Sequence, residues 1–208
     1  MIRKLATCLA TGVAAFGLAA CVSVLPEPKV PQGLYRFAAV ETVYDLEASI
    51  VVREPEASRL VAGRAIAAED SSGALRLVPN VEWTDSSTRL MQMAMLDALE
   101  GNGSGKAIVP ETGALAEYEL AWQVTDFTLS GTTGRCRVRA TLLEGASRDV
   151  LDQKIVSTTQ QADGDSNADR AKALAGAGRA CVDEVAGFVK AEARFYGWVE
   201  GVVLEIVS

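Results

Sequence analysis

The 208-residue sequence contains no histidine. This absence excludes Ser-His-Asp and Cys-His catalysis, histidine-ligated zinc and the usual general base near neutral pH. Carboxylates can catalyse reactions without histidine, so the absence lowers the expectation of an enzyme without abolishing it. No spacing of acidic residues indicates a carboxylate pair. We therefore predict no catalytic residues, no metal site and no cofactor.

The sequence also lacks a run of basic residues. Its 20 Lys and Arg residues face 27 Asp and Glu residues, which gives a formal net charge of −7. An acidic chain of this kind is a poor ligand for nucleic acid and for anionic lipid surfaces. We expect neither nucleic-acid binding nor a membrane contact made by charge.

The apolar run near the amino terminus is too short to span a bilayer comfortably. Residues 5–18 follow Arg3 and Lys4 and have the length of a secretory h-region. Small residues then precede a cysteine, as in a bacterial lipobox, where they admit the signal peptidase and the cysteine accepts a diacylglyceryl group. The motif consists of Leu18, Ala19, Ala20 and Cys21.

The lipobox divides the chain into a signal peptide, residues 1–20, and a mature part that begins at Cys21. A diacylglyceryl group with a further acyl chain such as palmitate gives the several chains that stable anchoring requires. The alternatives are an ordinary secretory signal that ends near a cysteine, or a membrane-spanning helix. No Asp follows Cys21, which favours the outer membrane, facing the periplasm. Residues 21–33 contain the lipidated cysteine and a Pro-rich spacer.

The chain has four cysteines. Cys8 leaves with the signal peptide and Cys21 carries the lipid. Cys136 and Cys181 remain in an oxidising compartment, and we predict a disulfide between them. The loop of about 45 residues would stabilise the fold by about 4 kcal/mol in the chain-entropy model. The alternative is a pair of buried free thiols.

Strand patterns dominate the first part of the globular region. Residues 34–40 and 48–53 are expected to form strands, the second of them central. Residues 64–69 and 74–78 flank the turn-forming sequence Asp-Ser-Ser-Gly at 70–73, which predicts a hairpin.

A helix is expected from Thr88, after capping side chains in residues 81–87. One face carries Leu90, Met91, Ala94, Met95 and Ala98. This Met-rich face is interpreted as core, with an adaptable binding surface as the alternative. The Gly-rich sequence 101–106 lacks the first glycine and the final Ser or Thr of a phosphate loop, so we interpret it as a connection.

Residues 107–109 form a short expected strand, and three long strands follow at 118–129, 135–142 and 150–159. Their short turns predict an antiparallel meander. One face of the second long strand carries Arg135, Arg137 and Arg139. These arginines are expected to pair with Glu119 or Asp126 across the hairpin, with a patch for an anionic ligand as the alternative.

A second helix is expected over residues 168–193. Its buried stripe consists of Leu174, Ala177, Cys181, Val185, Phe188 and Val189. Cys181 would therefore face the inward side of the strand that carries Cys136. The apolar tail, residues 195–208, could cap the domain, add an edge strand or touch a partner.

The order of these features resembles the ABC-type transport auxiliary lipoprotein family, the PqiC-like proteins. A tryptophan and an aspartate lead into the first helix of that family, and a tyrosine, a leucine and a phenylalanine mark the following strand. Trp83, Asp85, Tyr118, Leu120 and Phe127 occupy those positions here. The resemblance covers roughly residues 34–192. Ser86 replaces a proline that is common in the family, and the tail is longer than the pattern requires.

The resemblance implies an α+β domain over residues 34–194, with an antiparallel sheet and two helices on one face, similar to the TolB N-terminal domain. It implies a non-enzymatic lipoprotein that works with a periplasm-spanning MCE-domain protein and an ABC permease and ATPase. The system would move lipids or other hydrophobic molecules between the inner and outer membranes. The resemblance also suggests self-association.

Two other functions stay open at this point. The first is an accessory role in outer-membrane assembly or secretion, because related α+β domains occur in such machines. The second is a carboxylate-dependent hydrolase, which would require two carboxylates that converge in a deep pocket.

Overall fold

The computed structural model describes residues 31–38, 42–100 and 106–206, with side chains up to residue 193. The lipobox and most of the Gly-rich connection therefore lie outside the described residues. The strands are β1 Gly33–Tyr35, β2 Ile50–Val52, β3 Glu56–Ala57, β4 Ala65–Glu69, β5 Leu75–Trp83, β6 Ala107–Ile108, β7 Tyr118–Ser130, β8 Thr133–Glu144 and β9 Val150–Gln161. The helices are α1 Arg59–Ala62, α2 Ser87–Leu99, the 3-10 turn η2 Pro110–Thr112 and α3 Asn167–Ile206.

The meander of β7, β8 and β9 is confirmed. All three strands pair antiparallel, from Tyr118↔Glu144 to Ser130↔Thr133 and from Thr133↔Gln161 to Leu143↔Val150. Alternation along β8 buries Cys136, Val138 and Ala140 and leaves Arg137 and Arg139 exposed. The two-residue alternation of apolar and polar side chains that identifies a strand therefore also identifies the face of the strand that packs in the core.

The other edge of β7 is bordered by three short strands in series, each parallel to it. β2 pairs near Tyr118, β3 near Gln123 and β4 at Leu129. The sheet is consequently mixed, and the prediction of an antiparallel sheet is wrong outside the meander and the β4–β5 hairpin. An alternating apolar pattern identifies a strand but does not reveal which strand it pairs with. The partners in a parallel pair lie far apart in the sequence, so a local pattern cannot predict them.

The predicted hairpin is also confirmed, because β4 pairs antiparallel with β5 around a turn at residues 70–73. Asp70 Oδ1 accepts hydrogen bonds from the Ser72 and Ala74 amides, and Gly73 adopts a φ of 82° that suits glycine. β1 adds parallel to the far edge of β5. β1 includes Gly33, the last residue of the expected spacer.

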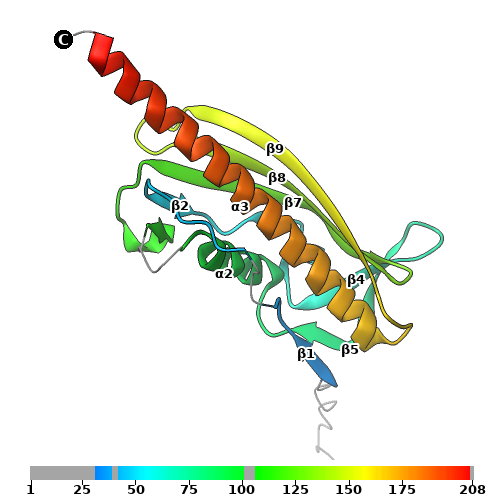
Figure 1. Ribbon diagram of the computed structural model, residues 1–208. Helices are drawn as coiled ribbons and strands as arrows, with labels where there is room; N and C mark the ends of the chain where they lie inside the picture. Colours follow the sequence, from blue (N-terminus) through cyan, green and yellow to red (C-terminus); the bar gives the residue numbers. More distant parts are fainter. Residues whose placement is uncertain (1–30, 39–41, 101–105, 207–208) are drawn as a thin grey trace, which may run out of the picture. The chain divides into compact units, whose positions relative to one another are not determined.

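Helices α2 and α3 contribute to one hydrophobic core with the inward side chains of the strands. α3 runs across one face of β7, β8 and β9, and it also contacts α2 (Figure 1). A Cβ at Gly134 would lie 2.6 Å from the backbone of Leu174, so glycine permits the close approach of α3 to β8. The α2 face is buried at Met91, Ala94, Met95 and Ala98, which confirms that these residues form core.

Helix α3 extends to Ile206, thirteen residues beyond the predicted end, and its last turns pass the ends of the strands it covers (Figure 1). The backbone of the tail is therefore helical up to that residue, and the edge-strand alternative is wrong. Among the described residues, no helix combines the length and apolar character needed to cross a membrane.

Candidate functional site

The five residues that carry the family resemblance lie in or beside the core. Trp83 stacks on Phe127 with ring centroids 5.5 Å apart, and Phe37 meets both rings edge-on at 5.6 and 5.8 Å. The Tyr118 hydroxyl donates to the carbonyl oxygen of Ala193 at 3.1 Å, which ties β7 to α3. Leu120 is fully buried, and Asp85 Oδ1 accepts from the Ser86 amide just before α2. These contacts stabilise the fold.

Cys136 and Cys181 are both buried free thiols in this structure. They are hydrogen-bonded to each other, so the predicted proximity of the two side chains is confirmed. Their oxidation state remains a prediction.

Arg135, on the predicted basic face of β8, is engaged in ion pairs inside the protein. Its guanidinium pairs with Glu69, and Arg135 Nε lies 3.2 Å from Asp126 Oδ2 without hydrogen-bond geometry. The predicted pairing with Asp126 is thus confirmed. Arg137 and Arg139 are exposed, so the alternative of an anionic-ligand patch is reduced to these two side chains.

Glu119 pairs with different arginines from those predicted. Arg148 approaches it with two hydrogen bonds of 2.9 and 3.1 Å, and Arg53 forms a further pair. The Glu119 side chain is 9% exposed. Burial raises the pKa of its carboxyl group, but the two guanidinium groups outweigh burial and lower that pKa. The cluster joins β2, β7 and the turn after β8.

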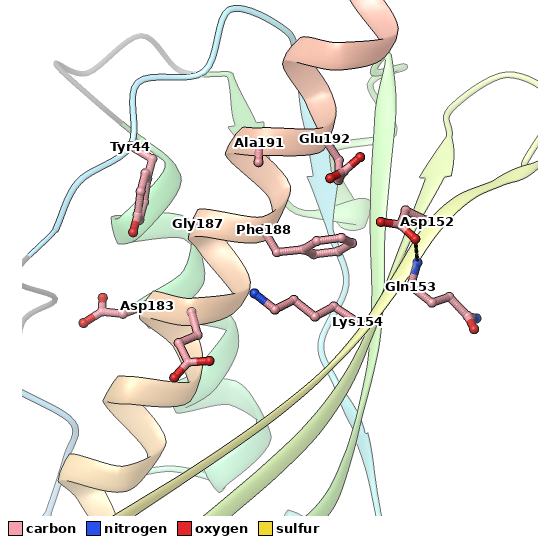
Figure 2. A pocket seen from close by; sticks show the side chains of 10 residues that line it. Tyr44, Asp152, Gln153, Lys154, Asp183, Gly187, Phe188, Ala191 and Glu192 are labelled. Carbon is pink, nitrogen blue, oxygen red and sulfur yellow. Dashed lines mark hydrogen bonds between the residues drawn. The ribbon is translucent and has the colours of Figure 1, made fainter.

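The candidate binding site is a groove of about 490 Å³ between β9 and α3, which we call the β9–α3 groove. It is lined by Tyr44, Asp152, Gln153, Lys154, Asp183, Glu184, Gly187, Phe188, Ala191 and Glu192. Lys154 and Phe188 point toward each other across the space between the strand and the helix (Figure 2). Phe188 is 6% exposed and forms an apolar floor, whereas Lys154 is exposed.

Local sequence explains how these side chains reach the groove. Even-numbered residues of β9 face α3, since Val156 is buried and Thr158 hydrogen-bonds the carbonyl of Ala177. Asp152 and Lys154 therefore also face the helix. A Cβ at Gly187 would lie 3.1 Å from the Tyr44 hydroxyl oxygen, so glycine at this position lets the ring approach α3.

The groove has the chemistry of a docking surface. Four carboxylates surround one ammonium group, and no nucleophilic hydroxyl or thiol other than the Tyr44 phenol lines the space. Within the described residues, no group of three metal-ligating side chains could hold an ion. An acidic rim over an apolar floor suits a partner segment with apolar and basic side chains.

Sequence reasoning did not find the groove. The sequence pattern placed Phe188 in the buried stripe of the second helix, but it gave no sign that β9 and Tyr44 lie beside that residue. The available signal was Lys154 on an otherwise uncharged stretch of β9, residues 153–161. A single lysine is too weak a signal to define a site, because the sequence does not show that α3 lies opposite this part of β9.

Comparison with known proteins supports the fold. A crystal structure of protein XCC0632 from Xanthomonas campestris, assigned to family model DUF330, matches with a TM-score of 0.67 at 17% identity, over 82% of this chain and 97% of that one. A second crystal structure, of an uncharacterized protein, matches with a TM-score of 0.60 at 12% identity, over 76% and 98% of the two chains. No curated protein sequence gives a significant match.

The family comparison agrees with the arrangement of strands and helices. The model of the ABC-type transport auxiliary lipoprotein component matches residues 37–186, which is more than two-thirds of the chain. The match includes the Trp83–Phe127 stack, the whole meander and the buried stripe of α3 as far as Val185. The mixed α+β fold, the order of the core residues and this match together show that the chain belongs to the family of ABC-type transport auxiliary lipoprotein components.

Proposed function

We propose that the protein is a lipid-anchored periplasmic scaffold of an MCE-type ABC system that moves lipids or other hydrophobic molecules between the inner and outer membranes. The observation that carries the proposal is the family match over residues 37–186, in a chain whose residues 18–21 fit the lipobox pattern. The absence of histidine and the chemistry of the groove support a non-catalytic role. Cys21 would anchor the protein in the outer membrane through its lipid.

The β9–α3 groove is the proposed contact surface for the periplasm-spanning MCE-domain protein. β9 pairs only with β8 among the described strands, so no other described strand covers its outer edge. A partner strand can add to such an edge while its side chains enter the neighbouring groove. The permease and ATPase would be reached through the MCE-domain protein.

Site-specific photo-crosslinking in native membranes tests both the partner and the surface. A photoreactive residue at Lys154, which is exposed and faces α3 in the groove, is expected to crosslink an MCE-domain protein that mass spectrometry identifies. The matched control places the same residue at Arg137, which is exposed on the opposite face of the sheet. Crosslinks to a porin-assembly or secretion component would support that alternative function instead. Equal crosslinking from both positions would contradict the assignment of the groove.

Self-association is a separate part of the proposal. Light scattering of the detergent-solubilised lipoprotein is expected to give a mass that is a multiple of the protomer mass. A mass equal to one protomer across the concentration range would contradict self-association and would leave the transport proposal unaffected.

A further inference from the structure

Two buried sulfur atoms connect α3 to the middle of the meander. Cys136 on β8 is 1% exposed and Cys181 on α3 is fully buried. Thr158 lies opposite Cys136 in the β8–β9 register. Thr158 Oγ1 donates to the carbonyl of Ala177 at 2.6 Å and lies 3.3 Å from Cys181 Sγ. These contacts bring the two thiols together, and they are hydrogen-bonded to each other.

We propose that Cys136 and Cys181 form an intramolecular disulfide in the exported protein. The inference rests on the export step of the proposed function and not on its transport role. A reducing compartment would keep the thiols free, whereas an oxidising compartment converts adjacent buried thiols into a stable bond. The bond would close the segment that contains β9 and the first part of α3, and would fasten the helix to the sheet.

The reaction requires a disulfide-bearing oxidant, either a small-molecule disulfide or a disulfide oxidoreductase. A thiolate of the chain attacks one sulfur of the oxidant, forms a mixed disulfide and releases the other oxidant sulfur as a thiolate. The second cysteine loses its proton and attacks the chain sulfur in the mixed disulfide. The new S–S bond forms and the remaining oxidant sulfur leaves. The chain thus loses two electrons and two protons, and the oxidant becomes two thiols.

In the folded protein, the surroundings of the two thiols shift their pKa values in opposite directions. The pKa of Cys181 is lowered because Cys136 donates a hydrogen bond to it, although burial opposes this effect. Burial raises the pKa of Cys136 well above its ordinary value, and the neighbouring Cys181 adds to that rise. Both sulfurs are inaccessible once α3 is packed. The exchange with the oxidant must therefore occur while the chain folds, before α3 closes over β8.

Thiol mapping of the full-length lipoprotein tests the bond directly. The protein is isolated from native membranes under acid, denatured and alkylated with iodoacetamide without a reductant, then digested for mass spectrometry. The peptides with Cys136 and Cys181 are expected as one crosslinked species, which takes up two alkyl groups only after reduction. Recovery of both cysteines alkylated in the unreduced sample would overturn the proposal.

Thermal unfolding provides a second readout. A reductant that reaches the bond is expected to lower the Tm of the isolated lipoprotein by on the order of 10 °C. The control C136A/C181A is expected to show no response to the reductant, and T158V, which keeps both sulfurs, is expected to respond as the wild type does. A wild-type Tm that does not change after complete reduction would overturn the stabilising role.

The thiol state is independent of the transport partner. A crosslinked Cys136–Cys181 peptide without any MCE-domain partner would support the disulfide and contradict the proposed function. An MCE-domain partner together with two free thiols would support the function and overturn the disulfide. The two failures are therefore distinguishable in the same membrane preparation.

Discussion

The two edges of β7 differ in how they are completed. On one edge, β8 pairs with β7 along its length after a two-residue turn, and β9 pairs with β8 after the longer connection formed by residues 145–149. On the other edge, β2, β3 and β4 add in series as short parallel strands from an earlier part of the chain. The first edge is built from local contacts and the second from contacts that span more than sixty residues.

This difference explains which parts of the fold depend on others. Hairpin strands find their partners at low entropic cost, whereas strands as short as β2 and β3, with three and two residues, cannot persist alone and need an existing template. We infer that β7 and β8, covered by α3, form the template. The short strands are held to it by the Trp83–Phe127 stack and by the Glu119 cluster.

The largest effect is expected for W83A, which removes the ring that joins β5 to β7. Trp83 is 1% exposed, and truncation of a large buried aromatic side chain costs about 3–5 kcal/mol. Urea denaturation followed by circular dichroism should show this loss in the free energy of unfolding. The control L77A removes an exposed side chain and should change the free energy by less than about 0.5 kcal/mol. An effect of W83A as small as that of L77A would contradict the joining role.

A smaller, pH-dependent effect is expected for E119Q. The pKa of Glu119 is lowered in the folded protein, because Arg53 and Arg148 outweigh the opposing effect of burial. Its contribution is therefore fully present above the unfolded pKa, about 4.3, and is lost as pH falls through the folded-state pKa. The two arginine side chains are about half exposed, so screening limits the loss at neutral pH to about 1 kcal/mol.

Stability curves of E119Q and wild type between pH 7 and pH 2 provide the measurement. The difference between the two proteins should be largest at neutral pH and should disappear at the acid end. E56Q, which changes an exposed carboxylate on β3, is the matched control and should parallel the wild type. A difference that grows toward low pH would contradict the direction of the pKa shift.

A similar loss, confined to the start of α2, is expected for S86A. Ser86 Oγ accepts a hydrogen bond from the Arg89 amide at 3.2 Å, which satisfies a free amide at the helix start. Loss of such a cap costs about 1 kcal/mol. Hydrogen exchange should accelerate for amides in the first turn of α2 and remain unchanged in β8. S86D, which retains a capping oxygen, should restore most of the protection.

The smallest effect on stability is expected at Asp70, in the exposed turn of the β4–β5 hairpin. Hydrogen bonds from the Ser72 hydroxyl, from Arg76 and from the Ser72 amide lower its pKa to about 2. NMR titration of the Asp70 carboxyl carbon should show this midpoint. R76Q should raise the midpoint while the Tm stays nearly constant. An ordinary aspartate midpoint in the wild type would show that the turn is not held by these bonds in solution.

Sequence patterns predicted the meander, the hairpin, the two long helices and most of their buried faces. They predicted the proximity of Cys136 and Cys181, because each position followed from a local period of two or 3.6 residues. They failed for the parallel pairing of β2, β3 and β4, for the arginine partners of Glu119 and for the groove. Each of these depends on segments that are distant in the sequence.

The sequence by itself determined the lipobox pattern, the acidic charge, the absence of histidine and the alternation that separates inner from outer faces. These properties belong to single residues or short segments, so they can be identified without knowing which other segments lie nearby in the fold. The tertiary structure decided which strands share β7, how close α3 approaches β8 at Gly134, and where Lys154 meets Phe188. The physical reason is that burial and close packing select among many strand pairings that have the same local pattern.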